Sequence, residues 1–179
     1  MQLTKNFNKV LNIDPASKQV TVQAGIKFRE LNEAIDPHGL ALTNVISTWA
    51  PTFVGAAQTG SHGTGIKYVS IATQIVSLRM VLANGTVIEA SANQNTDIFN
   101  AARVGLGALG IITSVTIQCE TAFNVAVHEK TVKLDELWTH VPERLAHDDY
   151  FLFYWLPHTD SVRLSSFNRT AAISKIGRA

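Results

Sequence analysis

Residues 105–110 read Gly-Leu-Gly-Ala-Leu-Gly, and the segments on either side of them limit what this chain can fold into. The pattern G-x-G-x-x-G binds dinucleotides when a strand precedes it and a helix follows, because the helix N-terminus must face the pyrophosphate. Here residues 96–103 have a helical pattern and residues 111–118 are β-branched, so the order is reversed. The sequence favours a helix C-cap glycine and a tight turn into a buried strand over a Rossmann site. Such a turn also lets backbone approach a flat ligand closely.

The rest of the pattern predicts an α+β fold with several hairpins. Asn84-Gly85 is the strongest two-residue hairpin signal, and Phe28, Leu31 and Ile35 recur at helical spacing. In the first two thirds of the chain, strands are expected over residues 9–14, 19–24, 40–46, 75–82, 86–90 and 111–118, and helices over residues 27–35, 52–59 and 96–103.

The pattern of residues in the sequence changes near residues 120–123. We expect a boundary there between a domain of residues 1–121 and one of residues 122–179. In the second part, strands are expected over residues 124–132, 150–156 and 161–167, and a helix over residues 134–145. Three strands and one helix are few for a stable sheet-and-helix layer, and they leave an edge and an apolar face open. We therefore expect the chain to self-associate or to depend on a complementing fragment.

Residues 59–65, Thr-Gly-Ser-His-Gly-Thr-Gly, are the most unusual stretch of the sequence. Glycines let successive N–H groups converge on an anion and hydroxyls add donors, which suits a phosphate. Composition alone favours a plain turn, and the stretch is not a Walker A loop because no Gly-Lys-Ser/Thr follows. His62 has the chemistry of a base or a ligand. The other five histidines have no metal-ligand spacing, so structural or exposed roles are expected for them and no metal site is predicted.

Composition excludes several classes of function. The sequence contains 15 basic and 14 acidic residues, so its charge does not favour nucleic acid or an anionic membrane as a partner. The chain has no secretory signal and no apolar run near the ~20 residues of a membrane helix, which predicts a soluble, cytoplasmic protein. The single cysteine, Cys119, excludes an internal disulfide. The charged fraction of 16% is below the roughly 25% of an average globular chain, so faces buried against a partner, a cofactor or further chain are expected.

The order of motifs resembles the FAD-binding (PCMH-type) domain of the vanillyl-alcohol oxidase superfamily. More narrowly, it resembles the alditol (xylitol) oxidases and the aldonolactone oxidases such as gulonolactone oxidase. The matching segments are VTVQAG with FRELNEAI, HGLAL, the stretch from Ser47 to Gly65 that ends in TGSHGTG, SLRMVLANGTVIEAS, and DIFNAARVGLGALGIITSVTIQ. They are collinear over about residues 8–120, and the TGSHGTG and GALGIIT blocks are specific in combination.

The resemblance implies that FAD lies across the first domain and faces a second, substrate-binding domain. The cofactor-binding residues that it implies are Ser47, Thr59, Gly60, Ser61, His62, Gly63, Thr64, Gly65, Ile111 and Ile112. His62 and Gly63 would lie near the flavin-diphosphate side, and Ile111 and Ile112 would offer backbone hydrogen bonds to the adenine end. The implied reaction is hydride transfer from a CH–OH group of a sugar alcohol or aldonolactone to the flavin, which oxygen or another acceptor reoxidises. No residue is nominated as a catalytic base.

Two parts of the family pattern have no counterpart in this sequence. One is an upstream G-x-G-H-S-like loop that wraps the pyrophosphate and often carries a covalently bound histidine, so non-covalent, weak FAD binding is expected. The other is most of the longer substrate domain. The alternatives are therefore a truncated oxidoreductase, a non-catalytic FAD-binding remnant, or one part of a split flavoprotein. If FAD binds, Gly63→Val is expected to abolish binding by blocking backbone approach to the cofactor.

Overall fold

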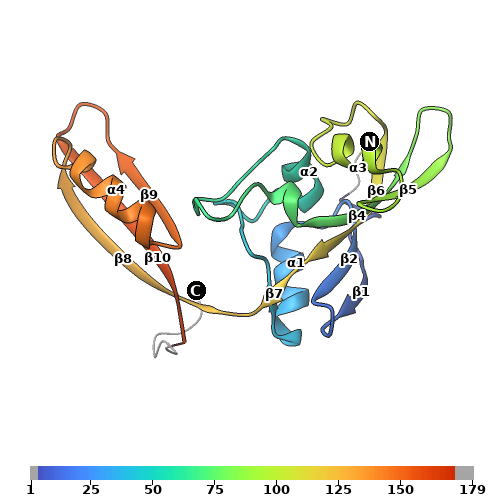
Figure 1. Cartoon of the computed structure of the whole chain (residues 1–179), viewed down its shortest axis with the longest axis horizontal. Helices are drawn as coiled ribbons and strands as arrows, with labels where there is room; N and C mark the ends of the chain where they lie inside the picture. The colour runs from blue at the N-terminus through green and yellow to red at the C-terminus, as the bar shows by residue number, and fades with distance from the viewer. Residues whose placement is uncertain (1–3, 172–179) are drawn as a thin grey trace. The chain divides into compact units, whose positions relative to one another are not determined.

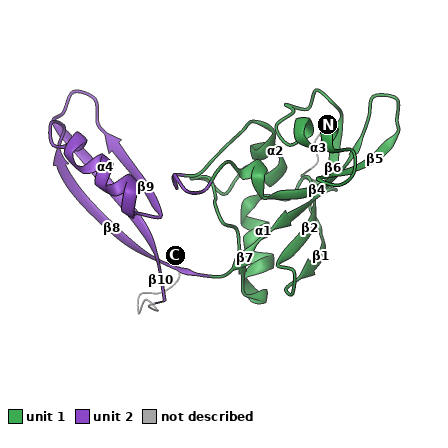
Figure 2. Cartoon of the chain, viewed as in Figure 1, with its two compact units in different colours: residues 1–63, 69–122 green, residues 64–68, 123–179 purple. Residues whose placement is uncertain are grey.

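The computed structural model describes residues 4–171, and the chain divides into two compact units (Figures 1 and 2). Unit 1 comprises Met1–Gly63 and Val69–Ala122, and unit 2 comprises Thr64–Tyr68 and Phe123–Ala179. Both combine helices with antiparallel strands, which confirms the α+β class. That the units are a FAD-binding domain and the start of a substrate domain stays a prediction. The membership of Thr64–Tyr68 in unit 2 was not expected.

The framework of unit 1 is a five-stranded antiparallel sheet whose strands follow the order β1-β2-β6-β4-β5. Alternation of side chains explains its faces: in β2, Val20 and Val22 are buried, whereas Thr21 points away from the core and shares a 2.9 Å hydroxyl hydrogen bond with Thr116 of β6. The strands are β1 (Val10–Asp14), β2 (Gln19–Gln23), β4 (Ile75–Val81), β5 (Val87–Ser91) and β6 (Ile111–Gln118).

The strand expected over residues 40–46 is much shorter than predicted. Only β3 (Leu40–Ala41) is extended, and it pairs with β7 (Glu120–Thr121), which the sequence did not predict. Beyond β3 the backbone bonds to a side chain instead of a strand. The Thr43 N–H donates to Oε1 of Gln74 at 3.1 Å, and Nε2 of Gln74 donates to the Asn44 carbonyl at 2.9 Å.

Two helices of unit 1 begin side by side, and this arrangement positions the candidate site. The Phe28 N–H donates to the Pro51 carbonyl and the Phe53 N–H to the Ile26 carbonyl, each at 3.1 Å. The fully buried rings of Phe28 and Phe53 meet at 5.5 Å between centroids. The helical segments of unit 1 are α1 (Phe28–Ile35), η1 (Asp36–His38), α2 (Phe53–Gln58), η2 (Ile71–Gln74) and α3 (Thr96–Ala102).

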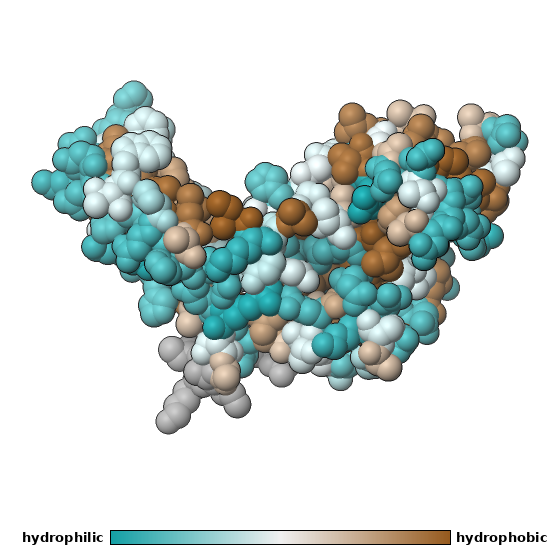
Figure 3. All heavy atoms as spheres, viewed as in Figure 1, coloured by the Kyte–Doolittle hydropathy of each residue, from teal (hydrophilic) through white to brown (hydrophobic). Residues whose placement is uncertain are grey.

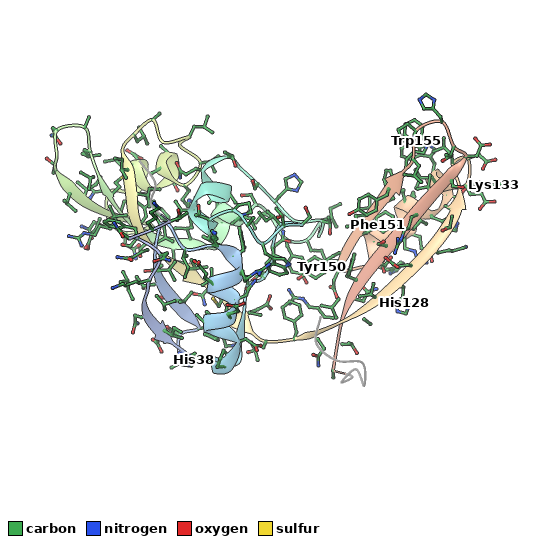
Figure 4. All side chains as sticks on the ribbon, turned by 180° about the vertical axis from the view of Figure 1, so that it is seen from behind. His38, His128, Lys133, Tyr150, Phe151 and Trp155 are labelled. Atoms are coloured by element: carbon green, nitrogen blue, oxygen red, sulfur yellow. The ribbon has the colours of Figure 1, made fainter. Side chains whose placement is uncertain are left out.

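Unit 2 is a three-stranded antiparallel sheet, ordered β8-β10-β9, with one helix packed on it. Its elements are β8 (Asn124–Lys133), α4 (Leu137–His147), β9 (Tyr150–Trp155) and β10 (Ser161–Thr170). Phe151 packs in the small core with Leu137 of α4, and the neighbouring Tyr150 projects from the other face of β9 (Figure 4). No helix within residues 4–171 combines the length and apolar character needed to cross a membrane.

Two boundaries in unit 2 differ from those expected. Helix α4 begins at Leu137 instead of residue 134 because turns form first: the Glu136 N–H donates to the Lys133 carbonyl at 3.1 Å. Strand β10 continues past residue 167 because Thr170 remains in register with Asn124 of β8. Long-range pairing, which local patterns do not record, sets this second boundary.

A buried carboxylate links α4 to β10 and makes the stability of unit 2 dependent on pH. Asp148 accepts hydrogen bonds from Ser166 Oγ at 2.5 Å and Asn168 Nδ2 at 2.8 Å, and Arg144 lies 3.8 Å away. Burial raises the pKa of Asp148, but these hydrogen bonds and the Arg144 charge outweigh burial and hold it below its ordinary value. A lowered folded pKa means that the carboxylate stabilises unit 2 above its unfolded pKa of about 3.9, and that this contribution is lost as the pH falls through the folded pKa.

We therefore expect Asp148→Asn to lower the thermal midpoint of unit 2 at pH 7 and to have a smaller effect at pH 3. Tryptophan fluorescence reports the transition, since two of the three tryptophans, Trp138 and Trp155, lie in unit 2. Asp160→Asn, in an exposed turn, is the control and should change neither midpoint. Equal destabilisation by Asp148→Asn at both pH values would contradict the assignment.

Candidate functional site

The first half of the glycine-rich loop, residues 59–65, closes the C-terminus of α2. The N–H groups of Gly60 and Ser61 donate to the carbonyls of Ala57 and Ala56, each at 3.0 Å, and Gly60 has a φ of 67°. These two bonds and the left-handed glycine form a Schellman cap. The Thr59 N–H also donates to the Ala56 carbonyl, at 3.3 Å. Three of the N–H groups that the sequence assigned to an anion are thus used by the helix.

The second half of the loop retains open donors. Among residues 4–171, the N–H groups of His62, Gly63 and Thr64 donate to no other group. His62 and Thr64 are exposed, and Nδ1 of His62 donates to the Gly63 carbonyl at 2.8 Å. The hydroxyls of Thr59 and Ser61 lie 3.2 Å apart at the base of the loop. Within unit 1, the N–H groups of His62 and Gly63 beside the hydroxyls of Thr59 and Ser61 are donors of the kind that bind phosphate oxygens.

Gly63 and Gly65 hold the loop against different parts of the protein. A Cβ on Gly63 would collide with the Asn44 side chain and lie 2.6 Å from the Val45 carbonyl oxygen, all within unit 1. A Cβ on Gly65 would lie 2.7 Å from the Asp149 carbonyl oxygen, within unit 2. Gly63 is therefore required by packing inside the protein, which is a different reason from the ligand approach expected from the sequence.

The second glycine-rich turn, residues 105–110, is joined to α2 by Gln58. The Gln58 carbonyl accepts from the Leu106 N–H at 3.3 Å, and its Oε1 accepts from the Gly107 N–H at 3.1 Å. Its Nε2 donates to the carbonyl of Ala102, the last residue of α3. Sequence reasoning missed Gln58; its one signal is a polar side chain at the end of a helix of small, apolar residues.

The structure confirms that a helix precedes this turn and a strand follows it. The expected C-cap glycine is wrong in detail. Arg103 is the C-cap of α3: its N–H donates to the Phe99 carbonyl and its φ is −59°, so the helix ends without a left-handed residue. The positive φ values come later, at Leu106 and Gly107. Gly105 has a different role, because a Cβ there would lie 3.1 Å from the Ala101 carbonyl oxygen.

An open pocket of about 470 Å³ lies between α2 and the start of β6. Its lining includes Val54 and Gln58 of α2, Gly107 of the turn, and Ile111 and Ile112 of β6. Pockets of about 300–1,000 Å³ with an apolar lining and a few polar groups are typical of small-molecule sites. The volume fits one planar ring system, and a Cβ on Gly107 would meet no protein atom within 4 Å, so this side of the turn is open to a ligand.

The turn beside the pocket is also unusually apolar at the surface. Four side chains around it are between 42% and 75% exposed, namely Val104, Leu106, Leu109 and Ile111. Figure 3 shows hydrophobic surface gathered near α3 on the visible face of unit 1. Exposed apolar side chains that cluster at a pocket mark a binding surface more often than singly scattered ones do.

The structure brings some of the predicted site residues together and leaves others apart. Ile111 and Ile112 line the pocket beside α2, from which the loop of residues 59–65 continues, but no residue of that loop lines the pocket. Ser47 is exposed in the segment before α2 and is also absent from the lining. Whether these residues bind a cofactor stays a prediction.

The described part of the chain holds neither a reactive thiol nor a metal-binding cluster. Burial, and secondarily the nearby Glu120 carboxylate, raises the pKa of the Cys119 thiol to about 11, so the thiol is protonated and unreactive at neutral pH. Across residues 4–171, no three His, Cys, Asp or Glu side chains gather as a metal site requires. What the described residues do present here is unbonded backbone donors in the loop and apolar surface at the pocket.

Comparison with known proteins agrees with this geometry. The FAD binding domain family matches residues 1–91, and the D-arabinono-1,4-lactone oxidase family matches residues 115–176. The chain belongs to the FAD-binding domain family, and membership implies FAD as the cofactor. It is related to aldonolactone oxidases and dehydrogenases, as the order of its motifs predicted.

Individual relatives are similar over most of this chain. It is 42% identical to the L-gulonolactone oxidase of Mus musculus, covering 88% of this chain and 36% of that protein. It is 37% identical to L-galactono-1,4-lactone dehydrogenase 1, mitochondrial, of Oryza sativa subsp. japonica, covering 87% of this chain and 27% of that protein. The chain thus spans about a third of the length of these relatives.

Solved structures share the fold. A cholesterol oxidase from Brevibacterium sterolicum superposes with a TM-score of 0.80 at 19% identity, covering 90% of this chain and 34% of that one. An alkyldihydroxyacetonephosphate synthase gives a TM-score of 0.78 at 18% identity, covering 92% of this chain and 37% of that one. At these identities the likeness is one of fold.

Proposed function

We propose that this chain holds FAD non-covalently as part of a flavoenzyme that oxidises a CH–OH group of a sugar lactone or sugar alcohol, with oxygen or another electron acceptor. The substrate class comes from the chain's relation to aldonolactone oxidases and dehydrogenases. Bound FAD would supply the hydride acceptor, and the protein would supply binding and orientation. The proposal assigns no catalytic base to this chain.

The observation that carries the cofactor assignment is the attachment of both glycine-rich segments to α2. The loop of residues 59–65 continues from the C-cap of α2, and Gln58 bonds the turn of residues 105–110 to the same helix. We assign phosphate binding to the N–H groups of His62 and Gly63, which belong to unit 1 together with α2. We assign contact with a planar ring of FAD to the pocket lined by Ile111 and Ile112.

Non-covalent attachment is supported by the hydrogen bond of the loop histidine. Because a carbonyl can only accept, Nδ1 of His62 carries a proton in its 2.8 Å contact with the Gly63 carbonyl. Nδ1 is thus engaged within the loop, and the backbone N–H groups offer an anion hydrogen bonds that need no covalent bond.

Ile111→Glu tests the pocket. Ile111 is 45% exposed, so a charged replacement leaves the fold intact while placing a carboxylate in the apolar pocket. We expect at least a tenfold weaker FAD affinity, about 1.4 kcal/mol, in a titration followed by flavin fluorescence. Acid denaturation of the wild-type complex should release the flavin into solution.

Val87→Glu is the matched control for this titration. Val87 is 49% exposed at the start of β5, in the same sheet but outside the pocket. We expect it to bind FAD as the wild type does. A wild-type chain that binds no FAD contradicts the proposed function, equal affinities of wild type and Ile111→Glu contradict the pocket assignment, and flavin retained on the denatured chain contradicts non-covalent attachment.

A further inference from the structure

Unit 1 buries two amide side chains, those of Asn44 and Gln74. They are 3% and 7% exposed, and among residues 4–171 no other polar or charged side chain of unit 1 is buried. Burying a polar group costs free energy unless the group forms hydrogen bonds. A buried amide whose donor and acceptor are both bonded makes the structure around it rigid. The partners of these two amides therefore indicate which part of unit 1 they hold in place.

Gln74 bonds both ends of its amide to the backbone of residues 43–44. Its Oε1 accepts from the Thr43 N–H at 3.1 Å, and its Nε2 donates to the Asn44 carbonyl at 2.9 Å. Gln74 is the last residue of η2, a short helix whose first residue, Ile71, is fully buried. The amide therefore ties residues 43–44 to an element that the core of unit 1 holds in place.

The Asn44 side chain joins the same segment to the other end of η2. Its Nδ2 donates to the Val69 carbonyl at 3.1 Å, and the next residue, Ser70, is the N-cap of η2. Because Gln74 holds the Asn44 backbone and Val69 holds its amide, the Asn44 side chain is fixed in position.

The glycine-rich loop packs against these same groups. The Ser61 carbonyl accepts from the Ile71 N–H at 2.9 Å, which bonds the loop to the start of η2. Gly63 lies so close to Asn44 that an added Cβ would collide with Oδ1 of that side chain. His62 therefore lies between two residues whose positions are set by η2 and by Asn44. All of these contacts are within unit 1.

We propose that Gln74 is a positioning residue for the cofactor: by fixing Asn44, it holds Gly63 in place, and with it the loop N–H groups that receive the FAD phosphates. This inference rests on the proposed function. Gln74 is too deeply buried to touch a ligand, and it lies outside both the loop and the lining of the pocket. Preorganised donors bind an anion more tightly than mobile ones because less ordering entropy is lost on binding.

Two substitutions in the full chain separate the hydrogen bonds of Gln74 from its volume. Gln74→Met has a similar length and fills the same space, but it can neither accept from Thr43 nor donate to Asn44. Gln74→Glu loses the donor when it is ionised, whereas its protonated carboxyl again offers one acceptor and one donor. Burial raises the pKa of a carboxyl above its ordinary value of about 4.3, so we expect the protonated form at about pH 5 and the ionised form at about pH 8.

Gln94 supplies the matched controls, Gln94→Met and Gln94→Glu. It is exposed between β5 and α3, in the same unit but outside the loop and the apolar pocket. FAD affinity is measured by titration followed by flavin fluorescence, at a low temperature at which circular dichroism shows each variant to be folded. The position of the loop is measured without FAD, from the backbone amide NMR resonances of His62 and Gly63.

We expect Gln74→Met to bind FAD about tenfold more weakly than the wild type at both pH values and to shift the resonances of His62 and Gly63. We expect Gln74→Glu to show the same loss at about pH 8 and to recover most of the affinity at about pH 5, each compared with the wild type at that pH. Both Gln94 variants should match the wild type throughout. A residue that contributed only to stability would leave the affinity of the folded protein unchanged.

The outcomes distinguish this inference from the proposed function. A wild-type chain that binds no FAD overturns the proposed function, whereas the resonances of Gln74→Met still show whether Gln74 fixes the loop. Unchanged resonances overturn the link from Gln74 to the loop, and shifted resonances with unchanged FAD affinity overturn the positioning role. If Gln74→Met fails to fold, recovery of affinity by Gln74→Glu at the lower pH supports the inference. An equal loss by Gln74→Glu at both pH values overturns it.

Discussion

Phe53→Ala is expected to destabilise unit 1 by about 3–5 kcal/mol, the range for truncating a buried phenylalanine. Phe53 is fully buried, and its ring packs on that of Phe28 at 5.5 Å. Its backbone N–H also joins the start of α2 to the residues before α1. Because α2 carries the glycine-rich loop and one wall of the pocket, FAD affinity should fall together with stability.

Chemical denaturation followed by circular dichroism measures this loss, and amide exchange in β2 and β6 assigns it to unit 1. Phe7→Ala is the control, since Phe7 is in the same unit but is 39% exposed. We expect it to cost about 1 kcal/mol or less. Equal destabilisation by the two substitutions would show that Phe53 is not central to the core.

Gly63→Val is expected both to destabilise unit 1 and to abolish FAD binding. The added side chain collides with Asn44 and with the Val45 carbonyl oxygen, so the loop must move, at a cost of about 1–3 kcal/mol. Loss of FAD binding then follows from displacement of the N–H groups of His62 and Gly63. The thermal midpoint and the FAD titration together separate this explanation from direct obstruction of the ligand, which would leave the midpoint unchanged.

Gly85→Ala is the control for glycine replacement as such. Gly85 has a φ of 82°, and a Cβ added there would meet no atom within 4 Å, so alanine brings backbone strain without a collision. We expect a loss of about 1 kcal/mol and unchanged FAD affinity. A Gly63→Val protein with the wild-type midpoint would contradict the predicted collision with Asn44 and Val45.

The sheet of unit 1 could be predicted from the sequence because its signals are local. Alternation in β2 and the Asn84-Gly85 turn between β4 and β5 each occupy a few consecutive residues. The strand expected over residues 40–46 was predicted too long for the opposite reason. There the Gln74 side chain, some 30 positions away, bonds the backbone that a neighbouring strand would otherwise occupy.

The candidate site was only partly predictable for the same reason. The two glycine-rich segments are visible as composition, but their attachment to α2 depends on Gln58, whose partner at Gly107 is 49 positions away. Three of the seven N–H groups in residues 59–65 belong to a helix cap, which composition does not distinguish from an anion cradle. The partner of Thr64–Tyr68 lies farther still, and no local pattern indicates it.

Because Thr64–Tyr68 is part of unit 2, the glycine-rich loop matures late during synthesis. Tyr68 leaves the ribosome 81 residues before its partner Asp149, an interval of about 4–16 s at typical elongation rates. Unit 1 has time to collapse in that interval, since hydrophobic collapse is far faster. On the nascent chain, the C-terminal end of the loop therefore stays unanchored during this interval. The loop reaches its final conformation only after the downstream segment has been translated and folded.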